Sequence, residues 1–288
     1  MVMKKAMKKI FPGVSWQNPL LNLVFKAINP VDYLVRLIYG RSGLPLYSIR
    51  VRSNGVTKQF GGKNFYKFGN QLAEHLETYA SLNKKSKVLE IGCGCGRTAF
   101  ALSRILENGN FVGVDIDKPS LHSCKQSSIF IRKNFRFEYM DVYNGEYNPT
   151  GKHHADTYKF PFEDNEFDVI FLVSVFTHML TDDVKNYISE ISRMLKPGGV
   201  CMVTTFLLDR GSQTNGISFP YNEKEHYYYN QKMPEVAVGY YLEFFKAQFA
   251  LFGLSQVHNT LWGNWRKTEE FQPSSKFGQD VIFFTKEM

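Results

Sequence analysis

From Ser86 to the end of the chain, strand-like segments alternate with helical segments, and this order most constrains the fold. The strand-like segments are short and rich in aliphatic and aromatic residues, whereas the others repeat apolar side chains at helical spacing. Such alternation is typical of a mostly parallel sheet whose strands are joined by crossover helices. We expect strands at 87–92, 111–117, 135–141, 167–175 and 200–208, and helices at 97–109, 121–132 and 181–199.

The C-terminal part of the chain predicts a different arrangement. An amphipathic helix is expected at 235–253, and two strands, 254–262 and 279–286, are close enough in sequence to pair antiparallel. The prediction is an α/β fold with a mostly parallel sheet, a C-terminal antiparallel β pair and an N-terminal helical extension. We place the extension, expected to act as a lid, at residues 1–67 and the catalytic domain at 68–288.

A glycine-rich turn, in the stretch VLEIGCGCGR, follows the first expected strand. Glycine permits positive φ and allows a ligand to approach the backbone closely. A dinucleotide fingerprint requires G-x-G-x-x-G and would place its last glycine where Arg97 stands. Glu90, two residues before the first glycine, would repel a pyrophosphate and attract a cationic amino group. The turn therefore favours a ligand other than a dinucleotide, bound by Gly92, Gly94 and Gly96.

Four motifs in the same order resemble those of class I S-adenosylmethionine-dependent methyltransferases. They are LEIGCGCGR, VGVDID, FPFEDNEFDVIFLVSVFTH and YISEISRMLKPGGVCMVTTF. The overall pattern is similar to bacterial, Rossmann-like members that modify small molecules or glycans. The resemblance implies S-adenosyl-L-methionine as cofactor and S-adenosyl-L-homocysteine as product.

The resemblance also implies roles for individual residues. The three glycines accommodate the methionine part of the cofactor, Glu90 faces its amino group, and Asp115 accepts hydrogen bonds from the ribose hydroxyls. Two carboxylates compete for adenine: Asp141 at the end of the third strand, and Asp156 at the family's usual distance from the following Pro-Phe pair. The position at a strand end favours Asp141. Ser174, near the end of the fourth expected strand, completes the expected cofactor site, whereas Asp117 is expected to be a helix N-cap.

His178 is the candidate general base, because it follows the fourth strand at the expected active-site end and imidazole titrates near neutral pH. The alternative is that His178 caps or packs the next helix, for which Thr181 is the expected N-cap. Members of the class that methylate base amines or glutamine amides usually carry an N/D-P-P-Y/F motif at this position, and Ser174–Thr177 lacks it. No metal site is expected, because Cys93 and Cys95 have no second close Cys/His pair.

Two kinds of acceptor fit the sequence. The first is a small molecule or saccharide methylated at oxygen, with Arg50–Arg52, Trp262 and Trp265 as candidate contacts. The second is a macromolecule, RNA or protein, docked through the basic N-terminal extension, since the formal net charge is +8. Lys4, Lys5, Lys8 and Lys9 precede an apolar stretch that suits a membrane surface or a helical lid. The expected location is cytoplasmic.

Overall fold

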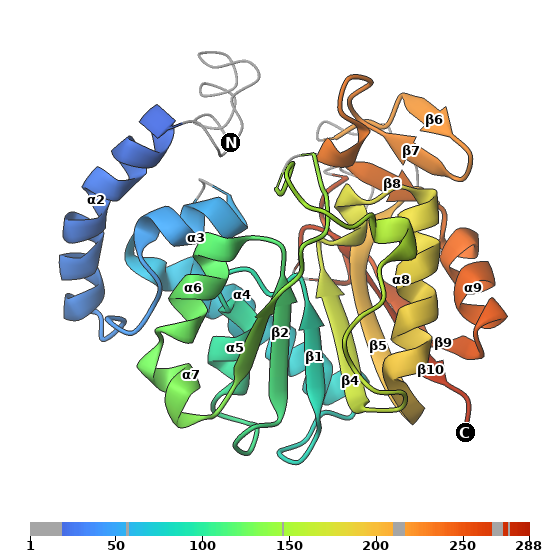
Figure 1. The fold of residues 1–288 in the computed structure, drawn as a ribbon, viewed down its shortest axis with the longest axis horizontal. Helices are drawn as coiled ribbons and strands as arrows, with labels where there is room; N and C mark the ends of the chain where they lie inside the picture. Colours follow the sequence, from blue (N-terminus) through green and yellow to red (C-terminus); the bar gives the residue numbers. More distant parts are fainter. Residues whose placement is uncertain (1–18, 56–57, 146, 210–216, 267–272, 276) are drawn as a thin grey trace. The chain divides into compact units, whose positions relative to one another are not determined.

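The computed structural model describes residues 19–55, 58–145, 147–209, 217–266, 273–275 and 277–288 (Figure 1). The chain forms two compact units, each assembled from two separate stretches of sequence. Unit 1 comprises Met1–Glu74 and Cys93–Tyr139, and unit 2 comprises His75–Gly92 and Met140–Met288.

Unit 1 combines N-terminal helices with two parallel strands. β2 (Phe111–Asp115) pairs with β3 (Arg136–Tyr139), and Val112 lies opposite Arg136. The helical elements are α2 (Pro19–Ile38), α3 (Tyr47–Asn54), η1 (Phe60–Gly62), the first part of α4 (Lys63–Tyr79), α5 (Arg97–Leu102), α6 (Lys118–Lys125) and α7 (Ser128–Arg132).

An aromatic cluster around Phe130 forms part of the core of unit 1. The Phe130 ring lies 4.8 Å from that of Phe100 on α5 and 4.9 Å from that of Phe137 on β3. The prediction of one helix at 121–132 was wrong in this detail. Ser127 is extended (φ −69°, ψ 118°), so α6 and α7 are separate helices and α7 can direct Phe130 into the core.

Helices α2 and α3 are joined by a buried ion network. The Asp32 carboxylate accepts hydrogen bonds from Arg36 Nε (2.8 Å), Arg50 Nη2 (2.7 Å) and the backbone N–H of Gly61 (2.8 Å). Asp32, Arg36 and Arg50 are all buried. The expectation that Arg50 contacts an acceptor was therefore wrong, because its guanidinium binds Asp32 inside unit 1.

Unit 2 is built on three parallel strands, β1 (Val88–Ile91), β4 (Phe167–Val173) and β5 (Leu195–Leu207), in the order β1-β4-β5. β10 (Asp280–Lys286) is antiparallel to β5, and β9 (Leu254–Leu261) is antiparallel to β10. At the far end of β5, three short strands follow in the order β8 (Val238–Tyr240), β7 (His226–Tyr228) and β6 (Tyr221–Glu223). The remaining elements are η2 (Ala155–Thr157), η3 (Phe176–His178), α8 (Thr181–Met194), η4 (Pro234–Val236) and α9 (Leu242–Leu251).

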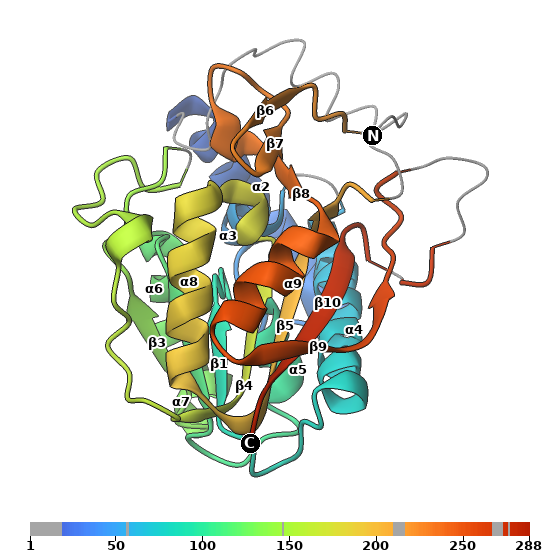
Figure 2. The same cartoon turned by 90° about the vertical axis from the view of Figure 1, so that its right-hand side faces the viewer.

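Helices α8 and α9 lie side by side against one face of the unit 2 strands (Figure 2). Consecutive side chains of β10 point to opposite faces of the sheet. The ring of Phe284 stacks on Phe249 of α9 at 3.9 Å, while that of Phe283 packs against Tyr79 at 5.1 Å. Tyr79 ends α4, so both faces of this strand are covered by apolar groups.

The predicted fold class is confirmed: the strands are mostly parallel, β9 and β10 form the antiparallel C-terminal pair, and helices occupy the N-terminal part. Three further local predictions were wrong. The helix expected at 97–109 is shorter, since α5 ends at Leu102. Only the second half of 235–253 is helical, since Val238–Tyr240 forms β8. Thr181 is the first residue of α8, and its hydroxyl bonds His226 Nδ1 (2.8 Å) while the cap position is Leu180.

A fully buried carboxylate, Asp280, fixes the start of β10. Its oxygens accept hydrogen bonds from both terminal nitrogens of Arg266, from Trp265 Nε1 (2.8 Å), and from the backbone N–H groups of Leu207 and Gly263. The expectation that Trp265 stacks on an acceptor was wrong, because its ring is buried and its N–H is held by Asp280.

We predict that Asp280→Ala destabilises the protein by about 3–5 kcal/mol, because the buried Arg266 guanidinium would lose its counter-charge. The measurement is urea unfolding followed by circular dichroism, with Asp182→Ala as control. Asp182 pairs with Lys224 at the surface, and its loss is expected to leave the midpoint unchanged. A small shift for Asp280→Ala, equal to that of the control, would contradict the structural role given to this carboxylate.

Candidate active site

The turn after β1 contains three glycines, and at two of these positions no other residue fits. Gly92, Gly94 and Gly96 have φ of 76°, 52° and 78°. A Cβ on Gly96 would lie 2.8 Å from Phe130 Cε2, and a Cβ on Gly92 would lie 2.4 Å from Val175 Cγ2. Both the positive φ and the close neighbours therefore require glycine there.

Asp115, the last residue of β2, holds this turn through its carboxylate. Oδ2 accepts a hydrogen bond from the Gly94 N–H (2.6 Å), and Oδ1 accepts one from the Asp117 N–H (2.8 Å). Asp115 is only 8% exposed, and burial raises the pKa of its carboxyl to about 6 against the lowering effect of these two hydrogen bonds. Each carboxylate oxygen has a second acceptor position, so the group can still bind hydroxyl donors.

The neighbouring Asp117 connects the same turn to helix α3. It is the N-cap of α6, as predicted, and accepts a hydrogen bond from the Ser120 N–H (3.2 Å). Arg52 of α3 donates to Asp117 Oδ1 (2.6 Å), and the hydroxyls of Ser53 and Ser120 are 2.6 Å apart. Arg52 was expected to contact the acceptor. It instead forms an ion pair with Asp117, which places α3 beside the residues around Asp115.

Glu90 is a buried acid within the otherwise aliphatic strand β1, at 3% exposure. It lies opposite Phe171 of β4. Strand β1 thus carries this carboxylate to a point two residues before the glycine turn.

Ser174 follows β4 directly and has an unusual backbone conformation, with φ of 62°. Its N–H donates to Thr204 Oγ1 (2.9 Å), and its hydroxyl donates to Gln279 Oε1 (2.7 Å). Thr204 also donates to Gln279 Oε1 (2.7 Å). A left-handed residue other than glycine costs about 1–3 kcal/mol and persists where its surroundings hold it. Thr204 and Gln279, which provide that support, carry no sequence motif that would have revealed them.

His178 ends η3, and its ring orientation is fixed by the main chain of η4. The Nδ1 atom lies 2.8 Å from the carbonyl oxygen of Glu235. A carbonyl only accepts, so Nδ1 carries the proton in the neutral ring and Nε2 carries the lone pair. The ring packs edge-on against Tyr147 at 5.3 Å. The side chain that accepts from the N-terminus of α8 is Asp183, which bonds the Leu180 N–H (3.1 Å).

Asp141 and Asp156 lie in different surroundings within unit 2. Asp141 is partly buried, and its carbonyl accepts hydrogen bonds from the N–H groups of Lys152 and His153, which closes the intervening insertion into a loop. Asp156 is exposed in η2, which Asn186 of α8 holds by donating to the carbonyls of Ala155 and Tyr158. Of these two carboxylates, Asp141 is the one that is partly buried and follows β3 closely.

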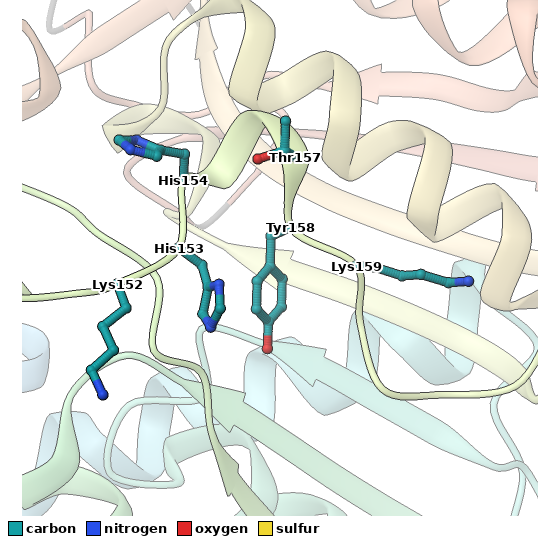
Figure 3. Close-up of a pocket in the computed structure, with 6 residues that line it drawn as sticks. All are labelled: Lys152, His153, His154, Thr157, Tyr158 and Lys159. Atoms are coloured by element: carbon teal, nitrogen blue, oxygen red, sulfur yellow. The ribbon is translucent and has the colours of Figure 1, made fainter.

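An open pocket of about 440 Å³ lies beside η2 and carries four basic side chains (Figure 3). The rings of His153 and Tyr158 lie alongside one another, with centroids 6.0 Å apart. Lys152 and Lys159 extend away from this pair in different directions. The lining is completed by His154 and Thr157. Among the residues that the structure describes, no group of three His, Cys, Asp or Glu side chains could hold a metal ion.

Comparison with known proteins identifies the region that contains most of these residues. Residues 89–203 match the family model described as "Methyltransferase domain". This stretch of the chain is therefore similar to a methyltransferase domain. The matched residues include most of β1, the glycine turn, Asp115, Ser174 and His178.

Solved structures agree with this fold. The PH0226 protein from Pyrococcus horikoshii is 18% identical and superposes with a TM-score of 0.53, covering 78% of this chain and 92% of that one. An S-adenosylmethionine-dependent methyltransferase from Methanosarcina mazei reaches 0.50 at 16% identity, covering 74% and 97%. The [4+2]-cyclase SpnF also reaches 0.50, at 13% identity, covering 76% and 82%. Since one of these is called a cyclase, the fold by itself does not specify the reaction.

Curated relatives share the domain but differ in acceptor. The tRNA N(3)-cytidine methyltransferase METTL2 of Bos taurus is 30% identical over 148 residues, which cover 47% of this chain and 35% of that protein. The phthiotriol/phenolphthiotriol dimycocerosates methyltransferase of Mycobacterium tuberculosis is 29% identical over 113 residues, covering 39% and 35%. The chain thus spans about a third of the length of these relatives, one named for a tRNA and one for a lipid.

The residues present fit the cofactor of this domain family. Asp115 keeps acceptor positions for the ribose hydroxyls, and its Oδ2 is only 2.6 Å from the glycine turn. The turn has glycine at three alternate positions, each with positive φ, as the cofactor motif of this domain family requires.

We predict that affinity for S-adenosylhomocysteine falls about tenfold between pH 7 and pH 5, because a carboxyl with a pKa of about 6 changes from mostly ionised to mostly protonated over this range. The ionised form binds hydroxyl donors more strongly, so binding is lost as pH falls through 6. Isothermal titration calorimetry at several pH values measures this. Asp115→Asn should flatten the profile, and Asp182→Asn should leave it unchanged; an unaltered slope in Asp115→Asn would assign the titration to another group.

Proposed function

We propose that the protein is an S-adenosylmethionine-dependent methyltransferase that transfers a methyl group to a hydroxyl of a small-molecule or saccharide acceptor. The observation that carries the choice of oxygen is the hydrogen bond of His178 Nδ1 to the Glu235 carbonyl (2.8 Å). The bond sets the tautomer of the neutral ring, in which Nε2 is the basic nitrogen, and the ring stands at the end of η3, which follows β4.

Each cofactor contact is part of this proposal. Asp115 accepts from the ribose hydroxyls, and Glu90 attracts the amino group of the methionine part. Asp141 rather than Asp156 contacts adenine, because Asp141 is partly buried and follows the last residue of β3 closely, whereas Asp156 is exposed. The remaining contacts are assigned to Gly92, Gly94, Gly96 and Ser174.

The chemistry asks little of the protein beyond positioning and proton transfer. When bound, S-adenosylmethionine supplies a methyl group already activated by its sulfonium. Holding an acceptor oxygen in line can contribute about 7–11 kcal/mol. His178 accepts the hydroxyl proton at Nε2, and the Glu235 carbonyl stabilises the resulting imidazolium through Nδ1–H.

We further propose that residues 1–67 form an extension and lid and that residues 68–288 form the methyltransferase domain. Support comes from α3 in the extension, where Arg52 and Ser53 bond Asp117 and Ser120 beside Asp115. We propose a cytoplasmic location on the basis of the sequence.

A macromolecular acceptor such as RNA is the second candidate. It is supported by the basic side chains of the pocket in Figure 3 and by the tRNA methyltransferase among the relatives. Contacts between lysines and phosphates make affinity fall steeply with salt, whereas a neutral small acceptor gives little salt dependence. The slope of activity against salt therefore separates the two candidates.

We expect Asp115→Ala to weaken binding of S-adenosylmethionine and S-adenosylhomocysteine at least tenfold, because charge-assisted hydrogen bonds to the ribose are worth about 1.5–3 kcal/mol each. Calorimetric titration of the purified protein tests this, with NADH as a ligand expected not to bind. An unchanged affinity in a folded Asp115→Ala variant would remove this carboxylate from the cofactor site.

We expect His178→Gln to lower kcat/KM for a hydroxyl acceptor by about 10²–10⁴ while cofactor affinity stays unchanged, because glutamine cannot take up the proton. Methyl transfer from labelled S-adenosylmethionine is measured against a panel of hydroxylated small molecules, saccharides and tRNA. The matched control is His122→Gln, an exposed histidine of α6. Wild-type activity in His178→Gln would leave the reaction without this base, and transfer only to tRNA would favour the second candidate.

A further inference from the structure

Helix α2, the first helix of the described chain (Figure 1), carries exposed apolar side chains from its first turn to its last. Six of them are each between 54% and 79% exposed: Leu20, Leu23, Val24, Val31, Leu34 and Ile38. With Ala27, these residues follow one another at intervals of three or four, except that Leu23 and Val24 are adjacent, and this spacing keeps them on one face of the helix. At 1.5 Å per residue, this apolar stripe is about 27 Å long.

The opposite face of α2 is attached to unit 1 by buried contacts. Phe25 packs edge-on against Tyr47 of α3 (6.2 Å), and the Asp32 carboxylate binds Arg36 and Arg50 out of solvent. Turning the helix would expose this ion network and bury the stripe, so the buried ions determine which face points outward. A surface helix normally has the reverse arrangement, with charges in water and apolar groups against the core.

Spanning a bilayer does not explain the stripe. No helix in the described part of the chain is long and apolar enough to cross a membrane. Within α2, Asp32 and Arg36 interrupt the apolar residues on the buried side only. A helix that is apolar on one outward face suits the boundary between water and lipid, where it lies parallel to the surface.

The charges within α2 and in the sequence before it favour an anionic surface. The sequence before α2 contains Lys4, Lys5, Lys8 and Lys9, and no acidic residue precedes Asp32. Lys26 and Tyr33, seven residues apart, are exposed on one edge of the stripe. Just beyond the helix, the Arg41 guanidinium lies over the Tyr39 ring at 5.2 Å. Tyr, Lys and Arg combine an apolar stem with a polar end, which matches the headgroup region of a bilayer.

We propose that the apolar stripe of α2 docks the protein on the surface of an anionic phospholipid membrane. The stripe inserts its aliphatic side chains among the acyl chains, and the lysines before it attract the lipid headgroups. Docking needs neither cofactor nor acceptor, so it goes beyond the proposed function and can be tested separately from it.

The test uses the full chain and vesicles of phosphatidylglycerol with phosphatidylcholine, or phosphatidylcholine alone, in a flotation assay. Wild type is expected to float with the anionic vesicles, less at raised salt, and at least about tenfold less with neutral vesicles. The triple variant L23Q/L34Q/I38Q is expected to lose at least about tenfold in partition to anionic vesicles. The matched control I131Q/L251Q removes two apolar side chains of similar exposure, 63% and 72%, from α7 and α9, and should float like wild type.

Thermal unfolding and calorimetric binding of S-adenosylhomocysteine accompany each variant. Equal midpoints and equal cofactor affinity, with flotation lost only in the triple variant, would support docking through α2. Wild type that does not float, or a triple variant that floats as well as wild type, would overturn the proposal. A wild-type dimer in sedimentation equilibrium that becomes monomeric in the triple variant, without vesicle binding, would overturn it in favour of a contact between two copies. Failure of the wild-type protein to bind S-adenosylhomocysteine would instead count against the proposed function.

Discussion

The hydrogen bonds of the Asp115 carboxylate hold together the part of unit 1 that contains the glycine turn and the start of α6. One oxygen holds the Gly94 N–H and the other holds the Asp117 N–H, so a single side chain joins the glycine turn to the start of α6. Asp117 then pairs with Arg52 and places α3. Burial raises the pKa of Asp115 to about 6, which shows that ionising this group inside the protein is costly. A ligand that donates hydroxyls to it would reduce that cost.

Two fully buried aspartates outside the candidate site have comparable structural roles. Asp32 joins α2 to α3 through Arg36 and Arg50, and Asp280 joins β10 to the end of β5 through Arg266 and two backbone N–H groups. A buried ion pair adds little net stability compared with apolar groups, but an unpaired buried charge is very unfavourable. Such pairs therefore penalise alternative packings. Asp280 follows Gln279, which supports the strained Ser174, so the buried pair and the candidate site share one strand end.

The docking inferred for α2 bears on the choice of acceptor. A methyltransferase held at a bilayer meets amphiphilic acceptors at high local concentration, and one curated relative is named for a mycobacterial lipid. The relative named for tRNA instead emphasises the basic side chains. Both the lysines before α2 and those of the pocket beside η2 attract anions, so net charge alone does not separate these acceptors. Contact with phosphates does not explain exposed leucines, so the aliphatic stripe of α2 supports the proposed membrane docking rather than an RNA contact at that helix.

The sequence by itself determined the α/β order of elements, the glycine turn, Asp115 at the end of β2 and the Asp117 cap, because each depends on spacing within a few residues. Only the tertiary structure decided what bonds across long separations: Ser174 with Gln279, His178 with the Glu235 carbonyl, Arg52 with Asp117, and Trp265 with Asp280. It also divided the helix predicted at 121–132 and placed strand β8 within the one predicted at 235–253. The periodicity of α2 is the same whichever face is buried, so its apolar stripe was visible in the sequence, but its outward direction follows from the buried partners of Asp32.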